Sequence, residues 1–238
     1  ASTPEEYVSQ DATAFWRSDL YSERGTLLTH AESIELFKQL GAGMTPELKS
    51  PAVAMPFEGD YTQRIYAQQM IDEYKAAGVD PRRVWAQSFN LNDVLYWIEH
   101  EPHFGKQAIF LDSRPYSQEN FAPTLTDFAS LRDSGVKIVA PPMFALLDLD
   151  HRGRIVPSEY ARLAKMAGLD IITWTFERSD LRGGGESNPF YYQSIGSAIE
   201  KESDKYLALD VLARKVKVLG IFTDWPATVT YYANCFGY

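Results

Sequence analysis

Glu47 and Lys49 are the first residues in the chain whose types and spacing point to chemistry. They end a short strand that follows the helix-ending segment 41–43, which reads Gly-Ala-Gly. Side chains alternate along a strand, so residues two positions apart point the same way. A carboxylate beside an ammonium at the carboxyl end of a strand can hold a metal ion and an anion together. Taken alone, the two residues favour a surface ion pair, and only the organisation of the rest of the chain raises the functional interpretation.

The rest of the chain alternates between strand and helix patterns, with one unit roughly every 35 residues. After the strand that ends at Lys49, further strands are predicted over 84–89, 108–112, 137–140, 170–176 and 218–224, which makes six. Helices are predicted over 29–40, 61–77, 125–134, 158–167, 199–213 and 226–232, and another begins at residue 92. In the first helix the spacing places Ile34, Phe37 and Leu40 on one face. Segments 50–60, 113–124 and 178–198 are predicted loops, and 147–156 is a predicted polar turn region.

This alternation predicts a parallel sheet built from βα units. Several strands are continuous apolar runs, as expected when both faces of a sheet are covered. Polar groups stand at or just past the carboxyl ends of four strands: Glu47 with Lys49, Gln87 with Ser88, Asp112, and Thr223 with Asp224. A β/α barrel keeps its active site at that rim. An open doubly wound sheet is the rival, but no strand is followed by the glycine fingerprint that such a sheet leads one to expect.

The predicted fold is therefore a TIM-type (β/α) barrel, with six of the eight units that closure requires. Either the count is short, or about two βα units are missing; the family resemblance described below implies that these are the first two. Residues 1–28 are predicted to be an extended N-terminal segment, and 29–238 to be the C-terminal part of the barrel.

Composition restricts the function further. The chain has 238 residues, of which 45% are hydrophobic and 13% aromatic, and its net charge is −9. An acidic protein of this kind is not a general nucleic-acid binder, which normally carries a basic face. No apolar run reaches the roughly 20 residues of a membrane span. Ala1 in place of methionine predicts that an N-terminal portion has been removed. Cys235 is the single cysteine; we predict a buried free thiol, with pairing to another chain as the alternative.

Four short motifs together resemble the glycerophosphodiester phosphodiesterase family, over about residues 29–238. The motifs are TPELK at 45–49, QSF at 87–89, ITWT at 172–175 and GIFTDWP at 220–226. Their order and spacing are similar to those of the third, fourth, seventh and eighth strands of that family's TIM barrel. Segments 30–51 and 61–110 resemble a bacterial exported subgroup, which implies a periplasmic or secreted protein.

The resemblance implies a site residue by residue. Glu47 resembles the third-strand glutamate that binds a divalent cation, calcium or magnesium, and Lys49 resembles the lysine that steadies the phosphate charge. Trp174 resembles the wall of the substrate pocket, and Gln87 and Phe89 are expected to line the same rim. The family's two catalytic histidines and its other two metal carboxylates belong to the first two strands, so neither histidine is identifiable in this chain.

Three further features of the sequence need separate interpretation. Segment 151–153 reads His-Arg-Gly but sits in a polar stretch after the fourth strand, where a solvated turn is the favoured interpretation. Asp148 to Glu159 has the spacing of a calcium loop, although Arg152 takes the place of one acidic ligand. The seventh-strand motif ends in Glu177 where the family has asparagine, which leaves the role of that position open.

The function that the resemblance implies is hydrolysis of glycerophosphodiesters to glycerol 3-phosphate and an alcohol. The barrel would be completed by an N-terminal piece, either the chain's own fragment or a second copy, and the chain alone is predicted to be inactive. Two alternatives stay open: a related phosphodiesterase acting on phospholipid head groups, and a non-catalytic remnant that binds phosphate compounds or a partner chain. Aromatic residues gathered at Trp174 and 190–192 predict a substrate with an apolar or cationic group, with loop packing as the alternative.

Overall fold

The computed structural model describes residues 25–187 and 189–237. Most of the segment predicted to be extended, residues 1–24 of 1–28, lies outside the described residues. Its last four residues, 25–28, form neither helix nor strand. Within the described ranges, no helix is both long enough and apolar enough to cross a membrane.

A parallel sheet forms the centre of the molecule, in the strand order β1-β2-β3-β6-β7. The strands are β1 (Gln87–Ser88), β2 (Ile109–Leu111), β3 (Ile138–Ala140), β6 (Asp170–Thr173) and β7 (Gly220–Ile221). Residues 44–48 extend the sheet beside β1 through isolated parallel bridges, Met44 with Val84 and Glu47 with Gln87. All six predicted strand positions are therefore present as neighbours in chain order, which confirms the parallel βα arrangement.

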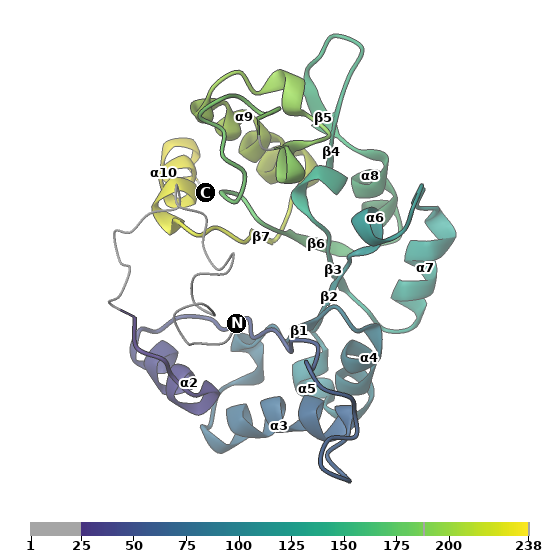
Figure 1. The fold of residues 1–238 in the computed structure, drawn as a ribbon, viewed down its shortest axis with the longest axis vertical. Coiled ribbons are helices and arrows are strands. Elements are labelled where there is room, and N and C mark those ends of the chain that lie inside the picture. Colours follow the sequence, from purple (N-terminus) through teal and green to yellow (C-terminus); the bar gives the residue numbers. More distant parts are fainter. Residues whose placement is uncertain (1–24, 188, 238) are drawn as a thin grey trace.

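Helices connect the strands and cover one side of the sheet (Figure 1). Their bounds are α2 (His30–Gln39), α3 (Gln63–Ala76), α4 (Leu91–His100), α5 (Pro102–Gly105), α6 (Arg114–Ser117), α7 (Leu125–Asp133), α8 (Glu159–Met166), α9 (Lys205–Asp210) and α10 (Pro226–Phe236). Local signals set the helix ends. Thr29 and Glu32 form the capping box that their spacing predicts, and Gly41, with φ +67°, provides the left-handed residue after α2.

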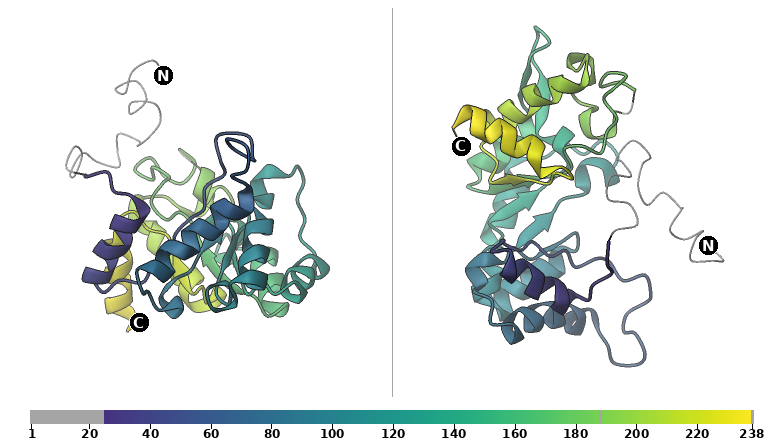
Figure 2. Two further views of the ribbon diagram at one scale, coloured as in Figure 1. Left: turned by 90° about the horizontal axis from the view of Figure 1, so that it is seen from below. Right: turned by 90° about the vertical axis from the view of Figure 1, so that its left-hand side faces the viewer.

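The sheet does not close into a barrel within the described residues. Residues 44–48 form one edge and β7 the other, and no pairing joins the two. Helices α2 and α10 lie at the two ends of this curved row of strands (Figure 2). The barrel-like curvature follows the prediction, whereas the absence of two further units stays a prediction.

Alternation along the strands divides the apolar core between the two faces of the sheet. Phe110 and Val139 pack outward in the large cluster beneath the helices. Their strand neighbours Ile109, Leu111 and Ile138 point inward and form a smaller cluster with Ala140. Half-buried side chains from the strand ends complete this inner cluster: Trp85, Phe89, Ile172 and Trp174. The inner face is therefore apolar at its base and open at the carboxyl ends of the strands.

The helix predicted over 29–40 is present as α2, on which Ile34 is buried, while Phe37 is 40% exposed and Leu40, just past its end, 68% exposed. Two other element predictions were wrong in part. The predicted polar turn at 147–156 is an antiparallel hairpin of β4 (Leu147–Leu149) and β5 (Ile155–Pro157). The predicted helix over 199–213 begins only at Lys205 and continues beyond α9 as a π-helix, Val211–Val216.

The turn of this hairpin contains two sequence motifs discussed above, the His-Arg-Gly segment at 151–153 and the acidic segment around Asp150. His151 is exposed in this turn, as the solvated-turn interpretation predicts. Asp150 accepts the backbone N–H groups of Arg152 and Arg154 and pairs with the Arg154 guanidinium. Its oxygens thus close the hairpin and are engaged by Arg152 and Arg154, while the calcium-loop interpretation of this segment stays a prediction.

Candidate functional site

Glu47 and Lys49 lie together at the edge of the sheet. Lys49 Nζ is 2.9 Å from Glu47 Oε1, and the two side chains are 75% and 23% exposed, respectively. Strand alternation therefore directs both to one side, as their spacing predicts, and they form an ion pair. Because an exposed pair of this kind contributes little to stability, the lysine ammonium can turn toward an anion without a large cost.

Gln87 lies beside Glu47 on the neighbouring strand. Leu48 N donates to Gln87 O and Gln87 N donates to Pro46 O, both at 2.9 Å. Residues paired across two strands project from the same face, so the amide of Gln87 stands next to the Glu47 carboxylate. The side chain is only 3% exposed. Its Nε2 donates to Thr45 O at 3.1 Å, whereas its buried Oε1 has no hydrogen-bond partner among the described residues.

Aromatic rings form the opposite wall of the site. Trp174 Nε1 donates to Ala140 O at 2.8 Å, which anchors the indole at the end of β3. The rings of Phe89, Tyr116 and Tyr191 meet it edge to face, with centroids 5.7, 6.0 and 6.1 Å away. Such perpendicular contacts stabilise one another and hold the wall in shape. Burial raises the pKa of Tyr116, and the nearby Tyr191 and Glu47 act in the same direction.

Tyr192 does not belong to this wall. Its ring is fully buried and its hydroxyl donates to Phe176 O at 2.9 Å. Of the aromatic residues that the sequence groups together, Tyr191 lines the site with Trp174, Phe190 packs against Tyr191 and Tyr116, and Tyr192 serves the core. Loop packing thus applies to Tyr192, whereas contact of Trp174 and Tyr191 with an apolar or cationic group of a substrate stays a prediction.

One pocket brings all five predicted site residues together. It has a volume of about 270 Å³ and lies on the inner side of the strand ends. The residues that line it are Glu47, Lys49, Gln87, Phe89, Leu111, Trp174, Thr175, Arg178, Tyr191, Phe222, Thr223 and Asp224. The structure thus places the predicted residues at one rim, while the role of each remains a prediction.

Arg178 is a pocket residue that the sequence prediction missed. Its side chain is 52% exposed, and its Nε lies 3.9 Å from Asp224 Oδ2. The sequence could have predicted this position, because Arg178 lies just past the end of the fifth predicted strand. Loops that follow parallel strands place their side chains at the same rim. The pocket therefore holds two cations, Lys49 and Arg178, each beside a carboxylate. This arrangement can neutralise a phosphate without giving the pocket a large net charge.

Glu177 joins the ends of the last two strands behind the pocket. It is buried and accepts hydrogen bonds from the Thr223 hydroxyl at 2.6 Å and from Asp224 N at 2.9 Å. Burial raises the pKa of Glu177, and these two hydrogen bonds oppose the shift. Glu177 therefore holds Thr223 and Asp224 in place from beneath and does not itself line the pocket.

Ser88 and Asp112, two polar residues at predicted strand ends, turn away from the pocket. The Ser88 hydroxyl donates to Asp93 Oδ2 at 2.8 Å. Asp112 is fully buried, is bound by the Arg114 guanidinium, and accepts from the Tyr160 hydroxyl at 2.6 Å. The prediction that these strand ends contribute to the rim was wrong, because each follows an inward-facing residue and so points to the opposite face.

The described residues do not fit a complete metal site. Nowhere in the described ranges do three histidine, cysteine or acidic side chains gather closely enough to hold an ion. The carboxylates of the pocket lining are Glu47 and Asp224, and each lies beside a cation, Lys49 and Arg178 respectively. The four histidines of the sequence, His30, His100, His103 and His151, do not line the pocket. His30, for example, pairs with Glu73, its Nδ1 2.6 Å from the carboxylate.

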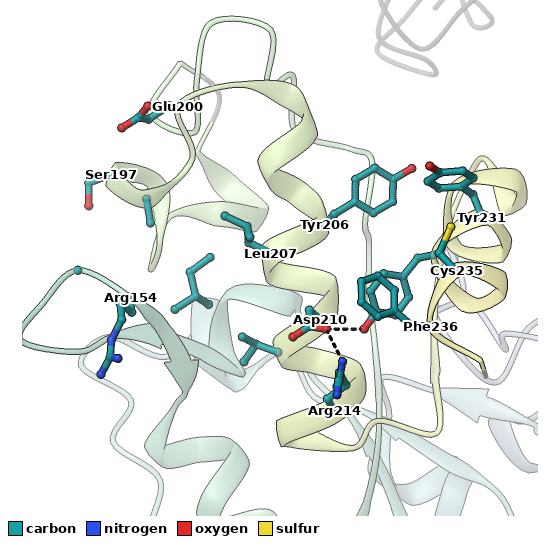
Figure 3. Close-up of a pocket in the computed structure, with 15 residues that line it drawn as sticks. Arg154, Ser197, Glu200, Tyr206, Leu207, Asp210, Arg214, Tyr231, Cys235 and Phe236 are labelled. Carbon is teal, nitrogen blue, oxygen red and sulfur yellow. Dashed lines mark hydrogen bonds and ion pairs between the residues drawn. The ribbon is translucent and has the colours of Figure 1, made fainter.

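A larger pocket, with a volume of about 890 Å³, lies elsewhere, between α9, α10 and the hairpin. Figure 3 shows Asp210 and Arg214 turned toward one another in this pocket, 3.7 Å apart; Asp210 also accepts from the Tyr232 hydroxyl at 2.8 Å. Cys235 lies at its edge on α10 and is exposed, so the prediction of a buried thiol was wrong. This cavity lies outside the rim of strand ends and contains none of the predicted site residues.

No family model matches the sequence. A curated protein of Arthroderma benhamiae, named "Extracellular protein", is 48% identical over 238 residues, covering 99% of this chain and 96% of that protein. The chain belongs to the same family as this protein. The identity establishes this family relationship, and the name of the relative states no activity.

Solved structures relate the fold to phosphodiesterases. A protein from Silicibacter pomeroyi described as a glycerophosphoryl diester phosphodiesterase matches with a TM-score of 0.56 and 17% identity. A glycerophosphodiester phosphodiesterase from Parabacteroides distasonis matches with a TM-score of 0.52 and 14% identity. Each match covers 87% of this chain, but only 56% and 64% of the two solved chains. At this identity the likeness shows the fold alone. The described residues are arranged as in a TIM-like barrel, without closing it.

Proposed function

We propose that the strand-end pocket binds a phosphodiester, with the phosphate between Lys49 and Arg178. The observation that carries the proposal is that a single pocket holds both cations and the Trp174 wall. The lysine and the arginine would neutralise the phosphate, and arginine can also bind it with two parallel hydrogen bonds. The aromatic wall would take the organic substituent of the ester. The likeness in fold to two phosphodiesterases supports a ligand of this class.

The same pocket supports phosphodiesterase-type chemistry only in part. Hydrolysis of a phosphodiester needs a general acid for the leaving alkoxide and a base for the attacking oxygen. No histidine lines the pocket, and the described residues do not complete a site for calcium or magnesium. We therefore propose that hydrolysis of a glycerophosphodiester to glycerol 3-phosphate requires groups from outside the described residues, from an N-terminal piece or a second copy. Those groups would include the histidines and the remaining ligands of the cation.

A second candidate is a protein that binds phosphate compounds without turnover. The absence of histidine from the described pocket lining favours it directly. The two candidates share the phosphate contacts and differ only in whether product forms. We further propose that the chain acts outside the cytoplasm, periplasmic or secreted, because its relative bears the name "Extracellular protein".

Exchanging Lys49 for methionine tests the phosphate contact. Isothermal titration with sn-glycero-3-phosphocholine is expected to show binding to the wild type and affinity lowered about tenfold in Lys49→Met, as for the loss of one charge-assisted hydrogen bond. Because the lysine is exposed, wild-type affinity should also fall with added salt. Lys75→Met, which removes a lysine far from the pocket, is the matched control and should bind normally. Equal affinities of wild type and Lys49→Met would contradict the proposed phosphate site.

A further inference from the structure

Gln87 carries the one buried polar atom of the pocket lining that lacks a partner in the described part of the chain. Its oxygen Oε1 accepts no hydrogen bond, although the side chain is only 3% exposed. A buried acceptor without a partner costs about 1–3 kcal/mol, and most such groups in folded proteins are satisfied. The atom is therefore the place where a ligand has most to gain by supplying a donor.

The orientation of the amide is fixed by its other end. Nε2 donates to Thr45 O, so the nitrogen faces the edge segment and the oxygen is left on the other side. Pairing of Gln87 with Glu47 keeps the side chain on the face that carries the pocket. Phe89, two residues along the strand, stands on the same face and packs against Trp174. Gln87 thus lines the pocket next to Glu47 on the paired strand, with Phe89 and Trp174 farther along the same face.

A hydrogen-bond donor fits this position better than a metal ion. The ammonium of Lys49 is already 2.9 Å from Glu47, and a divalent cation placed beside it would be repelled. The described residues also lack the third ligand that a cation would need. A hydroxyl group is small and neutral, and it donates to a carbonyl oxygen at about 2.7–2.8 Å.

We propose that Gln87 is a specificity-determining residue that accepts a hydrogen bond from a hydroxyl of the ligand's alcohol substituent. This inference rests on the proposed function and specifies its ligand: a phosphodiester with a polyol group at the Gln87 end and an apolar or cationic group at the aromatic end. Gln87 selects hydroxyl-bearing substituents over otherwise identical ones without hydroxyls.

Two probes that differ only in hydroxyl groups test this inference. They are sn-glycero-3-phosphocholine and propylphosphocholine, titrated calorimetrically into wild type and Gln87→Met. The wild type is expected to prefer the glycerol compound about tenfold, and Gln87→Met should reduce that ratio to about one, as for the loss of one hydrogen bond to a buried group. Loss of the contact to Thr45 O weakens both probes alike and leaves the ratio untouched.

Lys49→Met is the matched control, since it should weaken both probes and keep their ratio. Equal affinity of the wild type for the two probes, or a ratio in Gln87→Met unchanged from the wild type, overturns the inference and leaves the proposed function standing. If the wild type binds neither probe, the proposed function fails as well. The wild-type comparison decides the matter even if Gln87→Met does not fold.

Discussion

Replacing Asp112 with alanine is expected to lower the free energy of unfolding by about 3 kcal/mol, as for breaking a buried ion pair. Asp112 is fully buried and binds Arg114 through both carboxylate oxygens, at 2.8 and 2.7 Å. The variant leaves a guanidinium that is only 21% exposed and the buried Tyr160 hydroxyl without their acceptor. Denaturation in urea, followed by circular dichroism, measures the loss.

Glu159→Ala is the control for this experiment. Glu159 also pairs with an arginine, Arg162, but both side chains are more than half exposed, so a far smaller effect is expected. Equal losses in the two variants would show that burial of the Asp112 network does not matter. The network also has a consequence for the pocket, because Arg114 begins α6 and that helix carries Tyr116 of the aromatic wall.

Replacing Trp174 with alanine is expected to weaken binding of sn-glycero-3-phosphocholine about 100-fold, the effect of losing a central aromatic contact residue. Trp174 touches three other rings of the wall, so its removal also loosens Phe89 and Tyr191. Calorimetric titration measures the affinity.

Trp174→Phe keeps an aromatic face and should lose much less affinity. The melting temperatures of both variants separate weaker binding from partial unfolding. If Trp174→Ala is folded and binds as tightly as the wild type, the aromatic wall does not take part in ligand binding.

Sequence patterns predicted the helices and strands well where apolar residues recur with either the helical or the strand period. Helix spacing and capping signals predicted α2, α3, α7 and α8, and apolar runs between turn residues predicted all six strand positions. The hairpin over 147–157 was missed because its strands are short and interrupted by charges. The π-helix after α9 has no period of its own that a sequence pattern could reveal.

The pocket was predicted from strand ends together with the family resemblance of short motifs, and alternation explains which of the strand-end residues reach it. Glu47, Gln87 and Trp174 stand on the inner face and meet, whereas Ser88 follows an inward residue and must point outward. The same argument applies to Asp112, which follows the inward-facing Leu111, so stricter use of the two-residue period would have excluded both. Tyr116 had no such signal, because its position depends on the contact between Asp112 and Arg114 and not on a strand.

Phosphorus NMR of the wild-type chain with sn-glycero-3-phosphocholine, with and without calcium or magnesium, tests the central claim most directly. We expect the phosphodiester resonance to shift and broaden saturably as protein is added, with no glycerol 3-phosphate resonance emerging, because we propose that the pocket binds phosphate and its described lining has no histidine. A resonance that is unchanged at millimolar protein would contradict the binding site. Metal-dependent conversion to glycerol 3-phosphate by this chain alone would contradict the proposal that hydrolysis needs groups from outside it.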